Sequence, residues 1–203
     1  MTGSELSLIL ILTMVVRLVL LMQPWPIAVL VILLALEGGR RSALTAAAGI
    51  AAAAVLWFLA ARTGLAAPFV AGHAALLVQA SFLILCAALA WLSLRRALGH
   101  GPWTPRTGHA GTLVLPFVLY AVQPGVGTLW SGGDLPILAL DLTRPAGAAL
   151  GLALVAAGYG LLAWAASLGR LRAAFDRSAR PVHAVAAALF IFAALASTLA
   201  TFV

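Results

Sequence analysis

The chain has 203 residues, of which 64% are hydrophobic and only 8% are charged, and its formal net charge is +7. A water-soluble domain of this size needs far less apolar surface, so the composition excludes one and predicts an integral membrane protein. Because the apolar runs are continuous and do not alternate with polar residues, we expect an all-α protein and exclude a β-barrel.

Six hydrophobic segments are long enough to cross a bilayer, which takes about 20 apolar residues for each helix. We expect them at residues 6–36, 43–62, 74–94, 111–140, 145–168 and 183–203, within a single transmembrane domain that covers residues 1–203. The first and fourth are too long for one straight crossing, since thirty helical residues cover about 45 Å and the bilayer core is about 30 Å thick. Each of these two segments has a proline break near its middle.

The first segment contains Arg17, six residues before its break. A charge inside the bilayer costs about 2.5–3.5 kcal/mol on insertion scales, so we expect this side chain to face the protein interior and to have an acidic partner. Asp134 and Asp141, around the end of the fourth segment, are the candidates. Such a pair would act as a proton-linked gate or would hold the two halves together statically. Alternatively, Arg17 extends to the outer surface and only anchors the helix.

The break in the first segment is Gln23-Pro24-Trp25-Pro26. Proline has no backbone N–H and clashes with the preceding turn, so two prolines separated by one residue predict a locally unwound helix. Carbonyl groups freed in the bilayer are tolerated only where protein buries them or a wet cavity receives them. Gln23 would bind a polar ligand or satisfy these carbonyls, and Trp25 would line the cavity.

The sequence LEGGRRSAL, residues 36–44, joins the first two segments. Gly38 and Gly39 are suited to end the first helix, and Arg40 and Arg41 mark the cytoplasmic face. We interpret this stretch as a short turn that sets the topology, with gating or contact to anionic lipid as the alternative.

The fourth segment repeats the break as Gln123-Pro124-Gly125, and the glycine adds freedom to unwind. Two such breaks indicate two repeats of three helices, at about 1–99 and 111–203, joined by a cytoplasmic linker at about 95–110. Because three is odd, the second repeat would be inverted relative to the first, as in many secondary transporters. Both breaks are expected to bind substrate, and a kink that only aids packing is the alternative.

Most arginines lie in the first, third and fifth predicted loops. These nine are Arg40, Arg41, Arg95, Arg96, Arg106, Arg170, Arg172, Arg177 and Arg180. The second and fourth loops hold only Arg62 and Arg144, and basic residues concentrate in cytoplasmic loops. We therefore expect both termini on the extracytoplasmic side of a bacterial inner membrane, no cleaved signal peptide and no binding of nucleic acid.

Residues with the spacing of a metal site or of a catalytic set are not found in the sequence. The histidines, His73, His100, His109 and His183, are expected in loops or at segment ends, and Cys86 is the only cysteine. No nucleophile, acid and base converge in a recognised motif. We expect no metal, no cofactor and no catalytic residue, and an intramembrane enzyme is the least favoured alternative.

The stretch QPWPIAVLVILLALEGGRRSALTAAAGIAAAAVL, residues 23–56, resembles the opening of small exporters of the LysE superfamily. The similarity is greater to the glycolipid-addressing branch than to the amino-acid exporters. This resemblance implies six spans and the export of amino acids, metal ions or polar envelope lipids. By position, Gln23, Pro24 and Pro26 match the first family motif, and Gln123 and Pro124 match the second.

Departures from the family pattern favour an amphiphilic or lipid-like solute over an amino acid. Gln stands where the family has Asn in both halves, and Gly125 stands where the second motif has Lys. The function expected is a small secondary-transporter-like exporter, whose partners are membrane lipids and its solute, with a homodimer or envelope-lipid biosynthesis proteins as further partners. The alternative is a non-transporting scaffold subunit of an envelope-lipid machinery.

Overall fold

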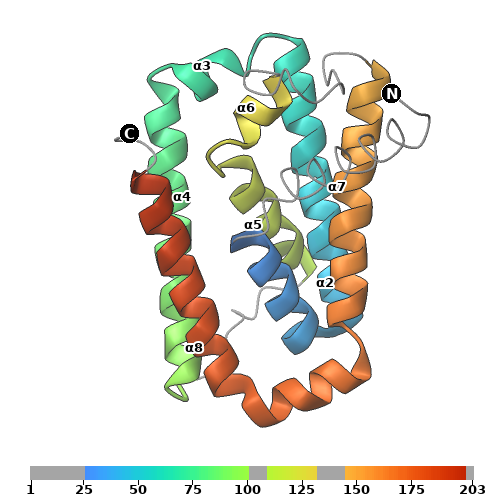
Figure 1. Cartoon of the computed structure of the whole chain (residues 1–203), viewed down its shortest axis with the longest axis vertical. Helices are drawn as coiled ribbons and strands as arrows, with labels where there is room; N and C mark the ends of the chain where they lie inside the picture. The colour runs from blue at the N-terminus through green and yellow to red at the C-terminus, as the bar shows by residue number, and fades with distance from the viewer. Residues whose placement is uncertain (1–25, 101–108, 132–144, 200–203) are drawn as a thin grey trace, which may run out of the picture.

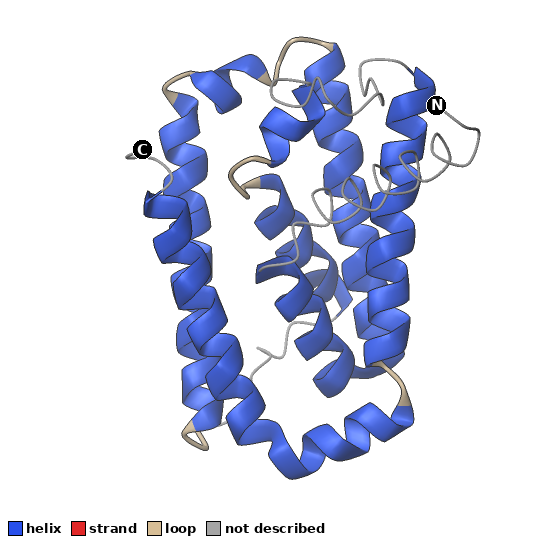
Figure 2. Cartoon of the chain, viewed as in Figure 1, coloured by secondary structure: helices blue, strands red, loops and turns tan. Residues whose placement is uncertain are grey.

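The computed structural model describes residues 26–100, 109–131 and 145–199, which are helical and contain no strand (Figures 1 and 2). The helices are α2 (Pro26–Arg62), α3 (Ala67–Ala71), α4 (Ala74–Ala97), α5 (His109–Ala121), α6 (Val126–Ser131), α7 (Pro145–Ala166) and α8 (Gly169–Leu199). The all-α prediction is thus confirmed for the described part of the chain. Arg17, Gln23, Pro24, Trp25, Asp134 and Asp141 lie outside the described residues.

Four of these helices are long and apolar enough to cross a membrane: α2, α4, α8 and, within α7, Ala149–Ala166. Large apolar side chains also cover the outside of the molecule; on α4, for example, Leu76, Leu77 and Ile84 are each at least 66% exposed. Such a surface is unfavourable in water and favourable against acyl chains. These features are those of a membrane-embedded protein.

The turn predicted between the first two segments is confined to Gly39. Its φ of 76° and ψ of −172° interrupt α2, and the chain reverses direction there (Figure 1). The helical hydrogen bonding resumes at once, and Ser42 Oγ donates to the carbonyl oxygen of Gly38 at 3.1 Å. The expected loop at 36–44 is therefore much shorter than its sequence indicates, because only one residue leaves the helical conformation.

Substituting alanine for Gly39 is expected to destabilise the protein by about 1–3 kcal/mol, because its φ of 76° and ψ of −172° lie in a region that is essentially restricted to glycine. The new Cβ would also lie 3.2 Å from a guanidinium nitrogen of Arg172. Thermal unfolding in detergent measures the effect. The matched control is Gly169→Ala, whose Cβ would meet nothing within 4 Å. Equal losses from both substitutions would contradict this prediction.

The helices pack as two groups. α2 contacts α5 and α7 extensively, and α4 contacts α8 along its length, whereas α2 and α8 share a smaller contact. In the first group the rings of Tyr120 and Tyr159 are buried edge to face, with centroids 6.5 Å apart. Gly49 lets α2 approach the backbone of α5 at Leu113 closely.

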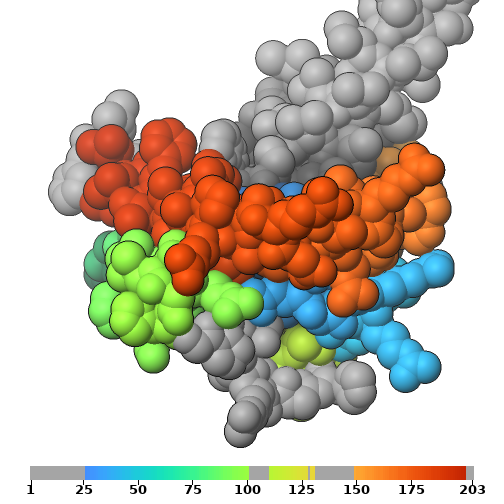
Figure 3. Space-filling view, turned by 90° about the horizontal axis from the view of Figure 1, so that it is seen from below, coloured from blue at the N-terminus to red at the C-terminus, as the bar shows by residue number. Residues whose placement is uncertain are grey.

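The last helix begins earlier than the sequence indicates. The arginine-rich stretch from Arg170 to Arg180 was expected in a loop before a helix at 183–203, but α8 already starts at Gly169. Its first part crosses one end of the molecule, and the helix turns at Ser178, where φ is −126° and ψ is 24°, to run beside α4 (Figures 1 and 3). The expectation of a loop was wrong, because arginine and alanine are both good helix formers.

The proline break in the fourth segment is confirmed. α5 ends at Ala121 and α6 begins at Val126, with Gln123, Pro124 and Gly125 between them. The second and third segments, expected at 43–62 and 74–94, agree with the helices observed there, and α7 begins where the fifth was expected. The count of six spans and the inverted repeats remain predictions.

A candidate binding cavity at the helix break

The backbone between α5 and α6 makes a tight turn. Pro124 has no N–H, so it cannot bond the carbonyl group of Tyr120 as a continuous helix would. Instead, the N–H of Gln123 donates to this carbonyl at 3.3 Å, and the N–H of Val126 donates to the carbonyl oxygen of Gln123 at 3.3 Å. Gly125 completes the turn with a φ of 84°, which other residues adopt only with strain.

Trp57 on α2 satisfies a carbonyl group that the break releases. In a continuous helix the carbonyl of Ala121 would accept from the N–H of residue 125; here the indole Nε1 of Trp57 donates to it at 3.0 Å. Trp57 is buried, and its ring fills the space beside Gly127, where an added Cβ would lie 2.8 Å from it. Nothing in the sequence singles out this tryptophan, because its partner lies 64 positions away.

A cavity of about 320 Å³ lies beside the break. Its walls come from the start of α2, from α4, from the break and from α8, and they comprise Pro26, Phe82, Gln123, Pro124, Gly125, Phe192, Ala193, Ala196 and Ser197. Among the predicted site residues, the structure thus brings Pro26 of the first break together with Gln123, Pro124 and Gly125 of the second.

A second cavity, of about 190 Å³, shares the break with the first. It is lined by Trp57, Phe69, Val70, Ala75, Leu76, Val78, Gln79, Gln123, Pro124, Gly125 and Gly127. Gln79 on its wall donates from Nε2 to Ser197 Oγ at 2.7 Å, and Ser197 lines the larger cavity. This hydrogen bond between α4 and α8 therefore lies where the two cavities adjoin.

The cavity walls are apolar with a few neutral polar groups. Among the described residues that line the two cavities, the polar side chains are those of Gln123, Gln79, Ser197 and Trp57, and none is an acid or an arginine. Gln123 is 6% exposed. Such walls suit a ligand with apolar parts and an uncharged or dipolar polar group, because an isolated ion would lose its hydration without a partner of opposite charge.

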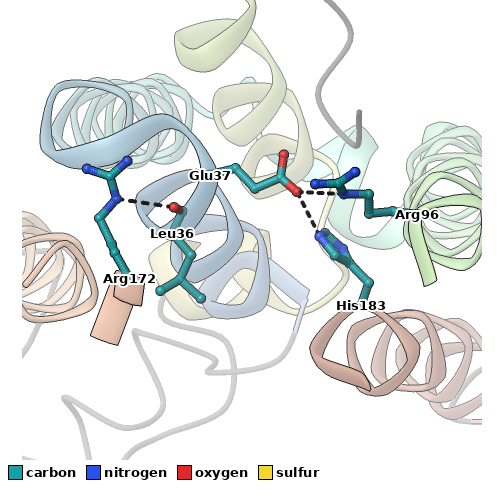
Figure 4. A network of polar contacts seen from close by, with 5 residues as sticks. All are labelled: Leu36, Glu37, Arg96, Arg172 and His183. Carbon is teal, nitrogen blue, oxygen red and sulfur yellow. Dashed lines mark hydrogen bonds and ion pairs between the residues drawn. The ribbon is translucent and has the colours of Figure 1, made fainter. Parts of the chain in front are cut away.

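A charged cluster joins α2, α4 and α8 (Figure 4). It lies toward the end of the molecule where α2 turns, α4 ends and α8 begins, which we call the arginine-rich end. Oε1 of Glu37 on α2 lies 2.8 Å from Nε2 of His183 on α8 and 3.4 Å from Nε of Arg96 on α4. The imidazole is fully buried, with the ring of Phe175 edge-on at 5.7 Å. Arg172 donates from Nε to the carbonyl oxygen of Leu36 at 3.3 Å.

This Glu37 cluster is absent from the sequence-based predictions. The charge pair that the sequence predicts is a different one, Arg17 with Asp134 or Asp141, and these three residues lie outside the described residues. His183 has no expected role because it stands alone in the sequence, 146 positions from its carboxylate partner. The one signal available is that Glu37 is an acid at the end of a long apolar run.

A metal centre is not formed by the helices that the structure describes, since no three His, Cys, Asp or Glu side chains meet within them. The resemblance to exporters of the LysE superfamily remains a prediction from the two Gln-Pro motifs. Comparison of the whole chain with family models, curated proteins and solved structures finds no match.

Proposed function

We propose that the chain is a small secondary-transporter-like exporter that moves an amphiphilic or lipid-like solute across the bacterial inner membrane. An amino-acid-like metabolite is the second choice of solute. The observation that carries the proposal is the cavity of about 320 Å³ between Pro26 and the Gln123–Gly125 break. Pro26, which ends the first predicted break, lines the same space as the break observed at Gln123–Gly125, and the substrate sites of broken-helix transporters are built in this way.

The pairing of helices supports two inverted repeats. In the predicted repeats, the second helices are the later part of α2 and α7, and the third helices are α4 and α8. α4 contacts α8, so the third helices lie together, and α2, which would hold the first and second helices of its repeat, contacts α7. A two-fold axis in the membrane plane between the halves would produce this arrangement.

The distribution of arginines supports the proposed orientation. Arg40 and Arg41 follow the turn of α2, Arg95 and Arg96 end α4, and Arg170 opens α8. These three places lie at one end of the molecule (Figure 1). We assign this end to the cytoplasm, because arginine and lysine concentrate on that side of bacterial membrane proteins.

Cysteine accessibility tests whether the cavity admits water. In a Cys86→Ala background, Gln123→Cys and Ser197→Cys are expected to react with a membrane-impermeant thiol reagent in vesicles of at least one orientation, because both residues line the cavity. Ala163→Cys is the control, since Ala163 is fully buried within α7 and lines neither cavity. Mass spectrometry of the labelled protein gives the reacted fraction.

The same measurement separates the exporter from the scaffold subunit. Protection of both cavity cysteines in vesicles of both orientations, at the level of the Ala163→Cys control, would contradict the exporter and favour the scaffold.

A further inference from the structure

We propose that Glu37, His183 and Arg96 form a proton-binding gate that closes the cytoplasmic end of the cavity. This inference rests on the proposed function and adds to it the coupling ion and the residues that bind it. The structure supports it through the position of the cluster, the helices that the cluster joins and the change of charge that one proton would bring.

The Glu37 cluster lies on the path between the cavity and the arginine-rich end. Pro26 lines the cavity, and Glu37 follows it by eleven residues of helix, or about 16 Å along the axis. Phe192 lines the opposite wall, and His183 precedes it by nine residues, or about 14 Å. From Pro26 forward along α2, and from Phe192 backward along α8, the chain leads to the same end of the molecule (Figure 1). The cluster therefore lies between the cavity and the arginine-rich end.

The cluster also connects the two groups of helices. Its carboxylate belongs to α2, and its two partners belong to the α4–α8 pair. The bond from Arg172 to the carbonyl oxygen of Leu36 is a second tie between α2 and α8 at the same end. Opening the cavity toward the cytoplasm requires α2 to separate from this pair, and the contacts of Glu37 must then break.

One added proton changes the charge balance of the cluster. With a neutral imidazole, the carboxylate of Glu37 and the guanidinium of Arg96 sum to zero. Adding a proton to either member of the Glu37–His183 pair gives a net charge of +1, and the proton belongs to the pair rather than to one residue.

Among the described residues, the other charged side chains at this end are mostly arginines. Arg172 of α8 donates to the carbonyl oxygen of Leu36, and Arg180 of α8 lies beside Gly99, just after α4. Asp176 of α8 is exposed, as are Arg40 and Arg41 of α2 itself. α5 and α7 contain no acid or arginine; their titratable residues are His109, Tyr120 and Tyr159. A proton on the carboxylate of Glu37 cancels the negative charge that attracts Arg96 and His183 to α2, so proton uptake by this group opens the gate.

The test measures how pH controls access to Ser197→Cys from the cytoplasmic face. Inverted membrane vesicles that carry this variant in the Cys86→Ala background are treated with a membrane-impermeant thiol reagent between about pH 8 and about pH 5.5. Ala173→Cys, at an exposed position of α8, corrects for the intrinsic pH dependence of the thiol. The corrected rate is expected to rise as pH falls, by up to about tenfold per pH unit, the limit for one linked proton.

Two variants assign the pH dependence to the cluster. Glu37→Gln mimics the protonated acid and should give a high corrected rate that does not vary with pH, whereas Asp176→Asn, which removes an exposed carboxylate on α8, should leave the wild-type profile unchanged. If Glu37→Gln fails to fold, as judged by gel filtration, His183→Gln should shift the midpoint of the wild-type profile, because the imidazole no longer shares the proton with the carboxylate.

Each outcome of the test is decisive. A cavity cysteine that reacts at a corrected rate independent of pH overturns the gate and leaves the exporter standing. A wild-type slope in Glu37→Gln, or an unchanged midpoint in His183→Gln, also overturns it. No reaction at any pH, from either face, overturns the proposed function and the gate together.

Discussion

Replacing Gly49 with alanine is expected to destabilise the protein by about 3 kcal/mol, at the upper end of the usual cost of overpacking. An added Cβ would collide with the carbonyl oxygen of Leu113 and would also lie 3.4 Å from the backbone nitrogen of Phe117. Backbone atoms within a helix cannot turn aside as the end of a side chain can. α2 and α5 must therefore move apart.

The damage should extend to the helix break. Trp57 lies eight residues beyond Gly49 on α2, and Ala121 lies eight residues beyond Leu113 on α5. Eight residues span about 12 Å of helix, so on both α2 and α5 the Trp57–Ala121 contact lies about 12 Å from the Gly49–Leu113 contact. Separating the helices at Gly49 lengthens the hydrogen bond from the indole to the carbonyl of Ala121, which now measures 3.0 Å.

Denaturation of the detergent-solubilised protein, followed by circular dichroism, measures the loss. Gly160→Ala is the matched control, because Gly160 is also within a helix and an added Cβ there meets nothing within 4 Å. That control should gain about 0.5–1 kcal/mol, since alanine loses less backbone entropy than glycine on folding. If Gly49→Ala is as stable as Gly160→Ala, the close contact between α2 and α5 is wrong.

Trp57→Phe is expected to cost about 1–3 kcal/mol, the range for leaving a buried polar group unsatisfied. Phenylalanine keeps an aromatic ring, but it has no N–H to donate to the carbonyl of Ala121 and lacks Cη2 and Cζ3, the indole atoms that lie beside Gly127. The same denaturation measurement applies, with Trp91→Phe as the control, because Trp91 is 61% exposed on α4. Equal stability of the two variants would show that this hydrogen bond does not hold the break.

Local chemistry made part of the fold predictable. The break at Gln123–Gly125 follows from the N–H that Pro124 lacks, and the turn at Gly39 follows from the conformational freedom of glycine. The second and third segments could be identified because nothing interrupts their apolar runs. In contrast, the arginines of α8 lie in a helix, because polarity alone does not distinguish an interfacial helix from a loop.

Most of the candidate site could not be predicted, because it depends on distant residues. Pro26, Gln123 and Pro124 were expected at the site from their shared motif, and the structure places them on one cavity. Trp57 bonds a carbonyl group 64 positions away, and Ser197 bonds a glutamine 118 positions away. Glu37 contacts His183 across 146 positions. No spacing in the sequence encodes these contacts, since they arise from how the helices pack.

The unequal packing of the helices has a mechanical consequence. Among the described helices, α2, α5 and α7 form one block and α4 with α8 forms another, and the contact between α2 and α8 at the seam is smaller than the contacts within the blocks. Walls of the larger cavity come from both blocks: Pro26 and Gln123 from one, Phe82 and Phe192 from the other. Rocking of one block against the other would change the volume between them and leave the helical hydrogen bonds intact, so the strain of such a cycle would fall on the side chains that bridge the seam.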